Sequence, residues 1–142
     1  MSEKKMLFVL KEEEPWNLSP DLYKLNPAGE LPVFLNDGNV IVGHYAISEF
    51  LEETQTETPL IYGPAKQKAE IRRMIDWFDN KFYREVYQNI VFEKVNKRFS
   101  SGMAPDSKTL KVGLNNIGYH LEYIEWLLGK HQYLVGEELT LA

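Results

Sequence analysis

Residues 26–53, NPAGELPVFLNDGNVIVGHYAISEFLEE, contain two backbone features that could together bind a small carboxylate ligand. Pro32 opens an apolar run, and a residue without an N–H is tolerated at the start of a strand. A cis Leu31–Pro32 bond would leave neighbouring backbone groups facing a cleft, where an extended peptide could pair with them. Gly43 and His44 open a helix, whose free N–H groups suit a carboxylate.

Side chains that commonly perform catalysis are sparse. The chain has no cysteine, which excludes thiolate catalysis, disulfides and cysteine-based metal sites. Asp76, Asp79 and Glu85 could be read as paired carboxylates, but a solvated helix face with i,i+4 partners such as Asp76 with Asn80 is the simpler interpretation. The catalytic residue, if there is one, is therefore unknown.

The chain has three histidines. His44 could contact a ligand at the helix N-terminus, or it could be an ordinary surface residue at a helix start. His120 is interpreted as a packed helix residue rather than a catalytic base, and His131 as a solvated residue beside a turn. Their separation shows no metal-ligand spacing, so no metal site is predicted.

The elements that must position these residues fall into two parts. In the first part, residues 6–10 (MLFVL) predict a strand, and residues 15–27 predict a loop with a helical turn. Residues 31–42 predict a hairpin around an Asp-Gly turn, and the apolar spacing changes to a helical period near His44. The polar, proline-containing stretch 54–64 predicts a linker.

The second part predicts two long antiparallel helices. Apolar residues recur at helical spacing over residues 65–99 and again over 107–128, with a short loop between them. Asp106 or Ser107 can cap the second helix at its start. Gly129 is placed to close it as the residue after the C-cap.

Charge and hydropathy exclude several classes of partner. The net charge is -5 and the isoelectric point is about 5.3, which disfavours nucleic acid and anionic membranes as partners. No apolar run approaches the roughly 18 residues of a membrane span, and residues 6–10 are too short for a secretory signal. Together with the absence of cysteine, this pattern predicts a cytoplasmic protein.

The quoted segments resemble the glutathione S-transferase family. The matching pieces are NPAGELPVFL, the Asp37-Gly38 turn and AISEFLEE, followed by two long helices and by GEELTLA at residues 136–142. The resemblance implies a thioredoxin-like α/β part over residues 1–53, a linker over 54–64 and an all-helical part over 65–142, with the first and last parts incomplete. It also implies that glutathione is a possible ligand, with its cysteinyl part at Leu31 and Pro32.

Three departures from the family pattern bear on catalysis. The family's Glu-Ser pair, which holds the γ-glutamyl end of glutathione, falls on Gly43 and His44, so the carboxylate for the ligand ammonium is missing. Only 25 residues precede Asn26, about half of what the family has, and no thiol-activating residue is recognisable there. The chain also ends before the helices that usually complete the hydrophobic-substrate pocket.

Residues 72–98 and 118–128 resemble more narrowly an alphaproteobacterial branch of this family that binds FtsZ filaments and does not conjugate glutathione. Lys94, Lys97 and Arg98 then form a candidate basic patch for an acidic partner. The alternative is that these cations complement the dipole at the C-terminus of their helix.

Two functions from different classes follow from these resemblances. One is a non-enzymatic FtsZ-binding protein of bacterial cell division, and the other is a glutathione-dependent transferase. A degenerate family member without a ligand is a third possibility. The aromatic residues between Trp77 and Phe92 lie on all sides of their helix, which predicts exposed aromatic surface and a homodimer or partner interface.

Overall fold

The computed structural model describes residues 1–142. The chain divides into two compact units, Met1–Pro59 and Leu60–Ala142, each of which is described by itself. We refer to them as the first and the second unit. The division falls inside the stretch predicted as a linker.

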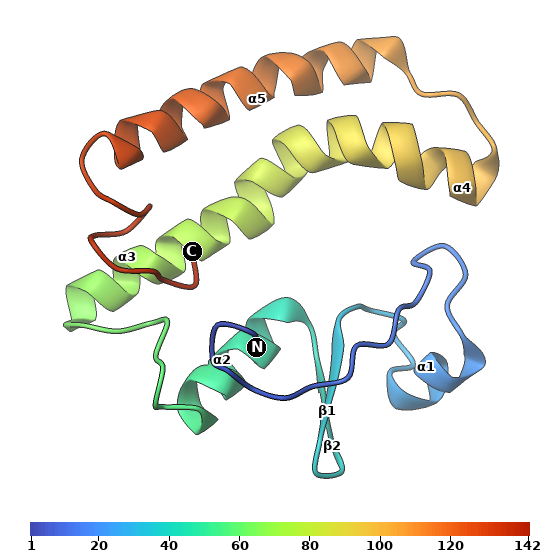
Figure 1. Cartoon of the computed structure of the whole chain (residues 1–142). Coiled ribbons are helices and arrows are strands. Elements are labelled where there is room, and N and C mark those ends of the chain that lie inside the picture. The colour runs from blue at the N-terminus through green and yellow to red at the C-terminus, as the bar shows by residue number, and fades with distance from the viewer. The chain divides into compact units, whose positions relative to one another are not determined.

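The first unit contains a short helix, a β-hairpin and a longer helix (Figure 1). Its elements are α1 (Pro20–Leu25), β1 (Val33–Asn36), β2 (Asn39–Val42) and α2 (His44–Thr54). The α1 helix has Ser19 as its N-cap, and the Ser19 hydroxyl accepts a hydrogen bond from the Leu22 N–H at 3.2 Å. The predicted helical turn within residues 15–27 is therefore confirmed.

The hairpin has the predicted position and turn. β1 and β2 pair antiparallel, with Val33 opposite Val42 and Asn36 opposite Asn39. Asp37 and Gly38 both have positive φ angles, 47° and 83°, as a tight two-residue hairpin turn requires. The helix predicted to begin near His44 is also confirmed, because α2 starts at that residue.

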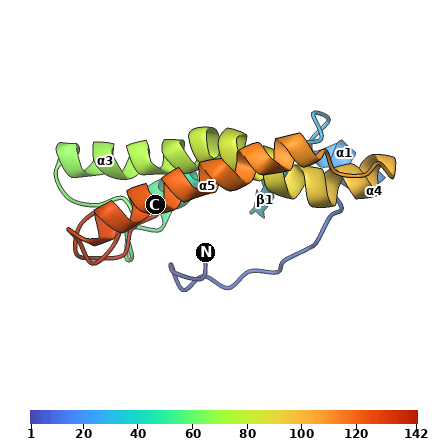
Figure 2. The same ribbon diagram turned by 90° about the horizontal axis from the view of Figure 1, so that it is seen from above.

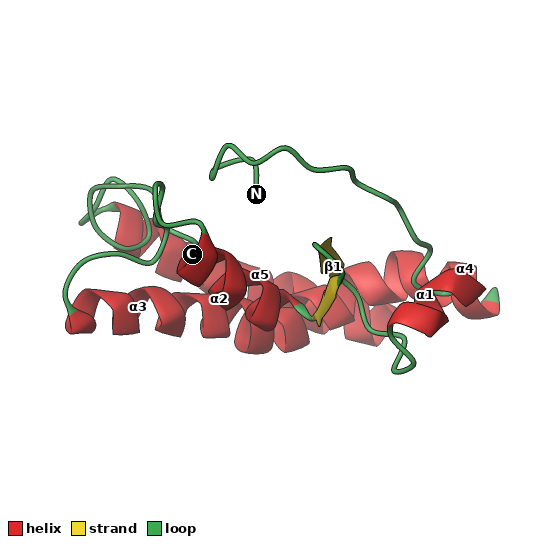
Figure 3. Cartoon of the chain, turned by 90° about the horizontal axis from the view of Figure 1, so that it is seen from below, coloured by secondary structure: helices red, strands yellow, loops and turns green.

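The strand predicted at residues 6–10 does not form, and Figure 3 shows this segment as a loop. Leu7 and Val9 are fully exposed, at 102% and 97%. A strand needs a neighbouring strand to accept its backbone hydrogen bonds, and in the only sheet β1 pairs with β2 alone. The prediction was wrong because apolar, β-favouring residues do not form a strand without a partner.

The N-terminal segment is instead anchored by one buried lysine. Lys4 Nζ donates to the backbone oxygens of Gln55 and Thr58, at 2.9 and 3.0 Å, and lies 2.8 Å from Glu52 Oε1. These carbonyls follow the C-terminus of α2, where unpaired carbonyls and the helix dipole favour a cation.

The second unit is a long bent helical rod with an antiparallel helix beside it (Figures 1 and 2). The rod consists of α3 (Ala65–Asp76), η1 (Trp77–Asn96) and α4 (Lys97–Ser101), and the second helix is α5 (Ser107–Leu128). The two predicted helices and their antiparallel packing are therefore confirmed. No helix of the chain combines the length and the hydropathy that a bilayer-spanning segment requires.

The middle of the rod, η1, is a π-helix. Its N–H groups reach one residue further back than in an α-helix, as when the Lys97 N–H donates to the Phe92 oxygen. The wider π-turn is rare and is usually found near functional sites. Asn80 donates to Asp76 at 2.6 Å near the start of η1, which agrees with the predicted solvated face.

The core of the second unit lies where α3 meets the C-terminal end of α5. The buried core residues are Ile61, Ile71, Met74, Ile75, Leu127 and Val135. Ile71 and Met74 are completely buried, so each truncation to alanine is expected to cost about 2–5 kcal/mol of stability.

Further along, α5 approaches η1 closely at a glycine. A Cβ atom on Gly113 would lie 2.6 Å from Ile90 Cγ1 and 2.8 Å from Asn89 Cβ. Gly118, five positions later on the same helix, has nothing within 4 Å of an added Cβ. The close contact between the helices therefore requires glycine at position 113 and not at 118.

The ends of α5 are partly as predicted. Asp106 is the N-cap, and its carboxylate accepts hydrogen bonds from the N–H groups of Lys108 and Thr109. Gly129 follows the last helical residue but has φ -70°, so it does not adopt the left-handed conformation expected of a closing glycine. The chain continues into a tight turn instead, in which the Lys130 N–H donates to the Leu127 oxygen at 3.0 Å.

Candidate functional site

The predicted ligand-binding backbone positions lie next to each other in the first unit. The Leu31–Pro32 peptide bond is cis. The Gly43 N–H donates to the Pro32 oxygen at 3.0 Å, which places the segment before β1 beside the start of α2. The Pro32 carbonyl is thus occupied within the chain, and the backbone groups of Leu31 remain the ones that a cis bond could present to a ligand.

The outer edge of β1 carries backbone groups that do not pair with β2. Because the Pro32–Gly43 pair is hydrogen-bonded, the alternation of an antiparallel ladder directs the peptide groups of Val33 and Leu35 away from β2. A cavity of about 300 Å³ lies along this side and includes Leu22, Leu31, Pro32 and Leu35 in its lining. An extended peptide could add to this edge as a further strand.

At the start of α2 the side chains offer less to a glutathione-like ligand. Gly43 is the N-cap, with φ 89° and no side-chain cap bond, and the first turn of α2 contains no acidic residue. His44 is exposed. The backbone N–H groups of the first turn can still attract a carboxylate, but no carboxylate stands at position 43 to hold an ammonium group.

The three predicted partner-binding cations are not equivalent. Lys94 and Arg98 are exposed, whereas Lys97 Nζ is bound to Glu93 Oε2 at 2.8 Å. The same Glu93 oxygen accepts the backbone N–H of Asp106 at 2.8 Å, so it ties the end of η1 to the start of α5. Lys97 therefore has a structural partner, and Lys94 and Arg98 keep their charge on the surface.

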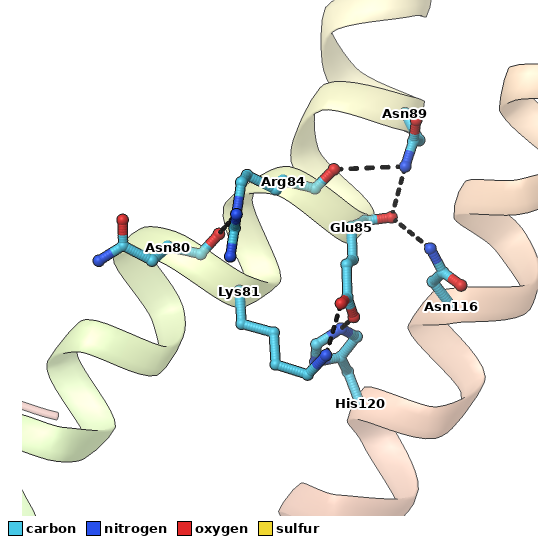
Figure 4. Close-up of polar contacts among 7 residues, drawn as sticks. All are labelled: Asn80, Lys81, Arg84, Glu85, Asn89, Asn116 and His120. Carbon is cyan, nitrogen blue, oxygen red and sulfur yellow. Dashed lines mark hydrogen bonds and ion pairs between the residues drawn. The ribbon is translucent and has the colours of Figure 1, made fainter.

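In the second unit, Glu85 is the centre of a polar network between η1 and α5 (Figure 4). Its Oε1 atom pairs with Lys81 Nζ, and its Oε2 atom lies 2.9 Å from His120 Nε2. Its backbone oxygen accepts hydrogen bonds from the side-chain amides of Asn89 and Asn116, at 2.8 and 2.9 Å. One residue thus links η1 to α5 through both its side chain and its backbone.

His120 is packed as the sequence predicted. Only 3% of it is exposed, and its ring lies against Trp77 and Phe82, with centroids at 4.9 and 5.2 Å. The Lys81 hydrogen bond, followed by that of His120, lowers the pKa of the Glu85 carboxyl below its ordinary value, so Glu85 is ionised at neutral pH.

A second charged pair lies two turns earlier on the rod. Arg73 binds Glu70 through both Nε and Nη2, at 2.8 and 2.6 Å, and Nη2 also donates to the Tyr123 hydroxyl at 2.8 Å. The Glu70 bonds, followed by the Tyr123 bond, raise the pKa of Arg73, and Arg73 lowers that of Glu70. Both charges persist at physiological pH.

These two clusters border one open cavity of about 510 Å³, which we call the interhelical cavity. Its lining comprises Arg73, Trp77, Lys81 and Glu85 from the rod and Tyr119, His120 and Tyr123 from α5. From the sequence, Glu85 was weighed with Asp76 and Asp79, and His120 by itself, so the contact between Glu85 and His120 was not predicted. The sequence signal for this side of the rod is the spacing of four residues between Arg73, Trp77, Lys81 and Glu85, which places their side chains on one side of a helix.

The chain contains no group of three or more His, Asp or Glu side chains that could hold a metal ion.

Comparison with known proteins adds an independent line of evidence. Residues 1–54 match the family model for the glutathione S-transferase N-terminal domain. The chain is 38% identical over 146 residues to FtsZ-localized protein A of Caulobacter vibrioides, covering 100% of this chain and 64% of that protein. A crystal structure of a glutathione S-transferase from Rhodospirillum rubrum F11 superposes with a TM-score of 0.93 at 43% identity, covering 98% of this chain and 63% of that one. The structure of FzlA from C. crescentus superposes with a TM-score of 0.90 at 38% identity, with the same coverage of both chains.

The chain is similar to members of the glutathione S-transferase family, and its residues 1–54 match the family's N-terminal domain. The predicted fold class, a thioredoxin-like α/β part followed by the family's helical part, is confirmed by these structures. Within the family, the chain is similar to FtsZ-localized protein A along its entire length. It spans slightly under two thirds of the lengths of these relatives, 63–64%.

Proposed function

We propose that the protein represented by this chain binds FtsZ in bacterial cell division and does not conjugate glutathione. The observation that carries the proposal is the similarity over the whole chain to a relative named for its localisation with FtsZ. The replacement of the family's Glu-Ser pair by Gly43 and His44 supports it, because the carboxylate that would hold the ligand ammonium is missing.

The partner surface in this proposal is the exposed cationic end of the rod. Lys94 and Arg98 attract an acidic segment of FtsZ, and Lys97, already paired with Glu93, contributes less. Charge attraction at an exposed surface acts mainly on the association rate and weakens with salt. Binding through these residues is therefore salt-dependent.

Sedimentation of the full-length protein with polymerised FtsZ tests the proposal. The protein is expected to pellet with filaments, and the Lys94→Glu, Arg98→Glu double variant is expected to pellet several-fold less, since each opposed charge also adds repulsion. The matched control is Lys66→Glu, Lys68→Glu, a double reversal on exposed residues of α3. Equal loss in both variants would show that net charge, and not this surface, governs binding.

A homodimer in the cytoplasm is part of the proposal. Its support is the exposed aromatic surface of the second unit, where Tyr83 is 42% and Phe92 45% exposed. Light scattering after gel filtration measures the mass directly, and a Tyr83→Glu variant is expected to shift the mass towards a monomer if this surface is the interface. Dimers of unchanged stability in that variant would place the interface elsewhere.

The predicted domain boundaries also remain proposals. They are a thioredoxin-like domain over residues 1–53, a linker over 54–64 and a helical domain over 65–142. Limited proteolysis of the full-length protein is expected to cut first within 54–64, and resistance of that stretch would argue against a linker.

The alternative is a glutathione-dependent transferase. It is favoured by the cis Leu31–Pro32 bond beside the start of α2 and by the exposed backbone edge of β1. Calorimetric titration with glutathione, followed by an assay with an electrophilic chloroarene, decides between the two functions. Saturable binding with product formation would make the transferase the leading function.

A further inference from the structure

One face of the rod alternates apolar and cationic side chains, and we call it the mixed face. Its members are exposed or half-buried and follow one another at intervals of one to four residues: Arg84, Tyr87, Val91, Lys94, Val95 and Arg98. We propose that the mixed face binds an acidic amphipathic helix of a partner, whose carboxylates pair with the cations and whose apolar residues cover the valines. That FtsZ supplies this helix rests on the proposed function, whereas the chemistry of the helix does not.

The spacing of the mixed face brings its apolar side chains to one side of the rod. Side chains four residues apart are neighbours on a helix surface, as the stacked rings of Tyr83 and Tyr87 show, with centroids 4.9 Å apart. Val91 and Val95 continue from Tyr87 at that spacing, and they are 37% and 40% exposed. The valines are therefore open to a partner.

The mixed face carries an unbalanced positive charge. Residues 80–101 contain five basic and two acidic side chains, in a chain whose net charge is -5. Both acids are paired with cations outside the mixed face, Glu85 with Lys81 and Glu93 with Lys97. These pairs leave the three cations of the mixed face without a carboxylate. The mixed face therefore favours an anionic partner.

A second copy of the chain does not suit the mixed face. A twofold interface places the same surface of both copies together, so the cations of one copy would approach those of the other. Like charges that meet in an interface weaken it. A homodimer is therefore expected to use other parts of the exposed aromatic surface.

The rod can recognise a partner through side chains only. Its backbone groups are paired along the helix, so an extended peptide would find no main-chain partner there. A partner helix has its own backbone paired, and it presents side chains at intervals of three and four residues, which match the mixed face. Exposed charge pairs contribute little each and are screened by salt. The apolar contacts therefore supply the part of the affinity that salt does not remove.

Two synthetic peptides test this chemistry. The first has about 18 residues, or five helical turns, with leucines on one face and glutamates beside them. The second has the same residues in an order that leaves no apolar face. Fluorescence anisotropy with the full-length protein is expected to show that the amphipathic peptide binds about tenfold more tightly. Equal binding of both peptides, or no saturable binding of the amphipathic one up to about 1 mM, would overturn the proposal.

Matched variants locate the peptide. The double variant Val91→Ser, Val95→Ser is expected to weaken the amphipathic peptide about tenfold and to leave the binding of the reordered peptide unchanged. The control is Val112→Ser, on a valine of α5 that is 52% exposed. All three valines lie outside the buried core, so the variants are expected to keep the fold. An equal loss in both variants, or no loss in the double variant, would contradict the proposal.

Other occupants of the mixed face would give different results. Conversion of a dimer into a monomer by Val91→Ser, Val95→Ser would assign the face to a second copy and overturn the proposal. Binding to phosphatidylserine vesicles without binding to the amphipathic peptide would assign it to a membrane surface, and would overturn the proposal as well.

Sedimentation with polymerised FtsZ separates this proposal from the proposed function. The wild type is expected to pellet with the filaments, and Val91→Ser, Val95→Ser several-fold less. Equal pelleting of both would overturn the proposal and leave FtsZ binding intact. Peptide binding without any pelleting of the wild type would support the acidic helix and refute FtsZ as its source.

Discussion

The imidazole of His120 meets the carboxylate of Glu85 at 2.9 Å, across a sequence separation of 35 residues. This pair joins η1 to α5 beside a cavity, and the Glu85 carbonyl also accepts hydrogen bonds from the side-chain amides of Asn89 and Asn116. Glu85 therefore forms hydrogen bonds both within its own helix, to Asn89, and to α5, through Asn116 and His120. We expect this residue to determine how firmly the two helices are joined.

Replacing Glu85 by glutamine tests that expectation at neutral pH. The variant keeps the shape and the capacity to bind His120, but it loses the charge that pairs with Lys81. Because the Glu85 side chain is 39% exposed, solvent screens the pair and the expected loss is only about 0.5–1 kcal/mol of unfolding free energy. Urea unfolding measures it, with Glu122→Gln on exposed α5 surface as the control. An equal effect in both variants would deny Glu85 a special role.

The pH dependence of the same variant has a definite sign. The pKa of Glu85 is lowered in the folded state from its ordinary value of 4.5. Its contribution is therefore fully present above about pH 4.5 and is lost as the pH falls through the lowered folded value. The stability difference between wild type and Glu85→Gln should shrink on acidification from pH 6 to about pH 3. A difference that grows over this range would mean that the folded pKa is raised.

Two glycines of α5 provide a matched test of helix packing. Gly113→Ala places a Cβ within 3 Å of both Ile90 and Asn89, and overpacking of this kind costs about 1–3 kcal/mol. Gly118→Ala meets nothing within 4 Å and should stabilise the helix by up to about 1 kcal/mol. Thermal unfolding of both variants should shift in opposite directions. Equal shifts would show that α5 does not approach η1 closely at Gly113.

Lys4 should stabilise the first unit even though it stands near the N-terminus. Lys4→Met removes the partner of a Glu52 carboxylate that is 8% exposed and of two backbone oxygens. Breaking a buried pair on one side costs about 3–5 kcal/mol. The double variant Lys4→Met, Glu52→Met should recover part of that loss, because the buried Glu52 carboxylate is removed as well. Hydrogen exchange of the backbone amides at the C-terminal end of α2 measures this loss of stability. An unchanged exchange rate in Lys4→Met would show that Lys4 does not stabilise the first unit.

Gly43 stands where the family has the carboxylate that holds the ligand ammonium, and it also has an unusual backbone conformation. Gly43 has φ 89°, a conformation that side chains rarely adopt, so Gly43→Glu should cost about 1–2 kcal/mol of stability although an added Cβ would have open space. His44→Ser lies in ordinary helical backbone and should cost much less. Chemical unfolding compares the two variants. A Gly43→Glu variant as stable as wild type would show that this backbone strain is absent.

Much of the fold was predictable because its signals are local. The Asp37-Gly38 turn between apolar residues predicted the hairpin, and Asp106 before an apolar stripe predicted the start of α5. The prediction of a strand at residues 6–10 was wrong for the opposite reason, since a strand needs a neighbouring strand, and no local sequence pattern shows whether there is one. Gly129 follows its helix without the left-handed geometry, because the next turn closes the helix end instead.

The site in the second unit was less predictable. Glu85 was weighed with Asp76 and Asp79, and not with His120, because the contact between Glu85 and His120 depends on the register between two helices. No helical periodicity in the sequence distinguishes the π-turns of η1 from α-turns. Leu31, Pro32, Gly43 and His44 were predicted together because the family motif joins them, although their ligand remains a prediction.

The most direct test of the central claim is a paired titration of the full-length protein with glutathione and with polymerised FtsZ. Our account predicts a saturable FtsZ signal and no glutathione heat up to about 5 mM, a concentration that would reveal even a millimolar site. Saturable glutathione binding without an FtsZ signal would contradict it, and would mean that a site with Gly43 and His44 can still bind glutathione.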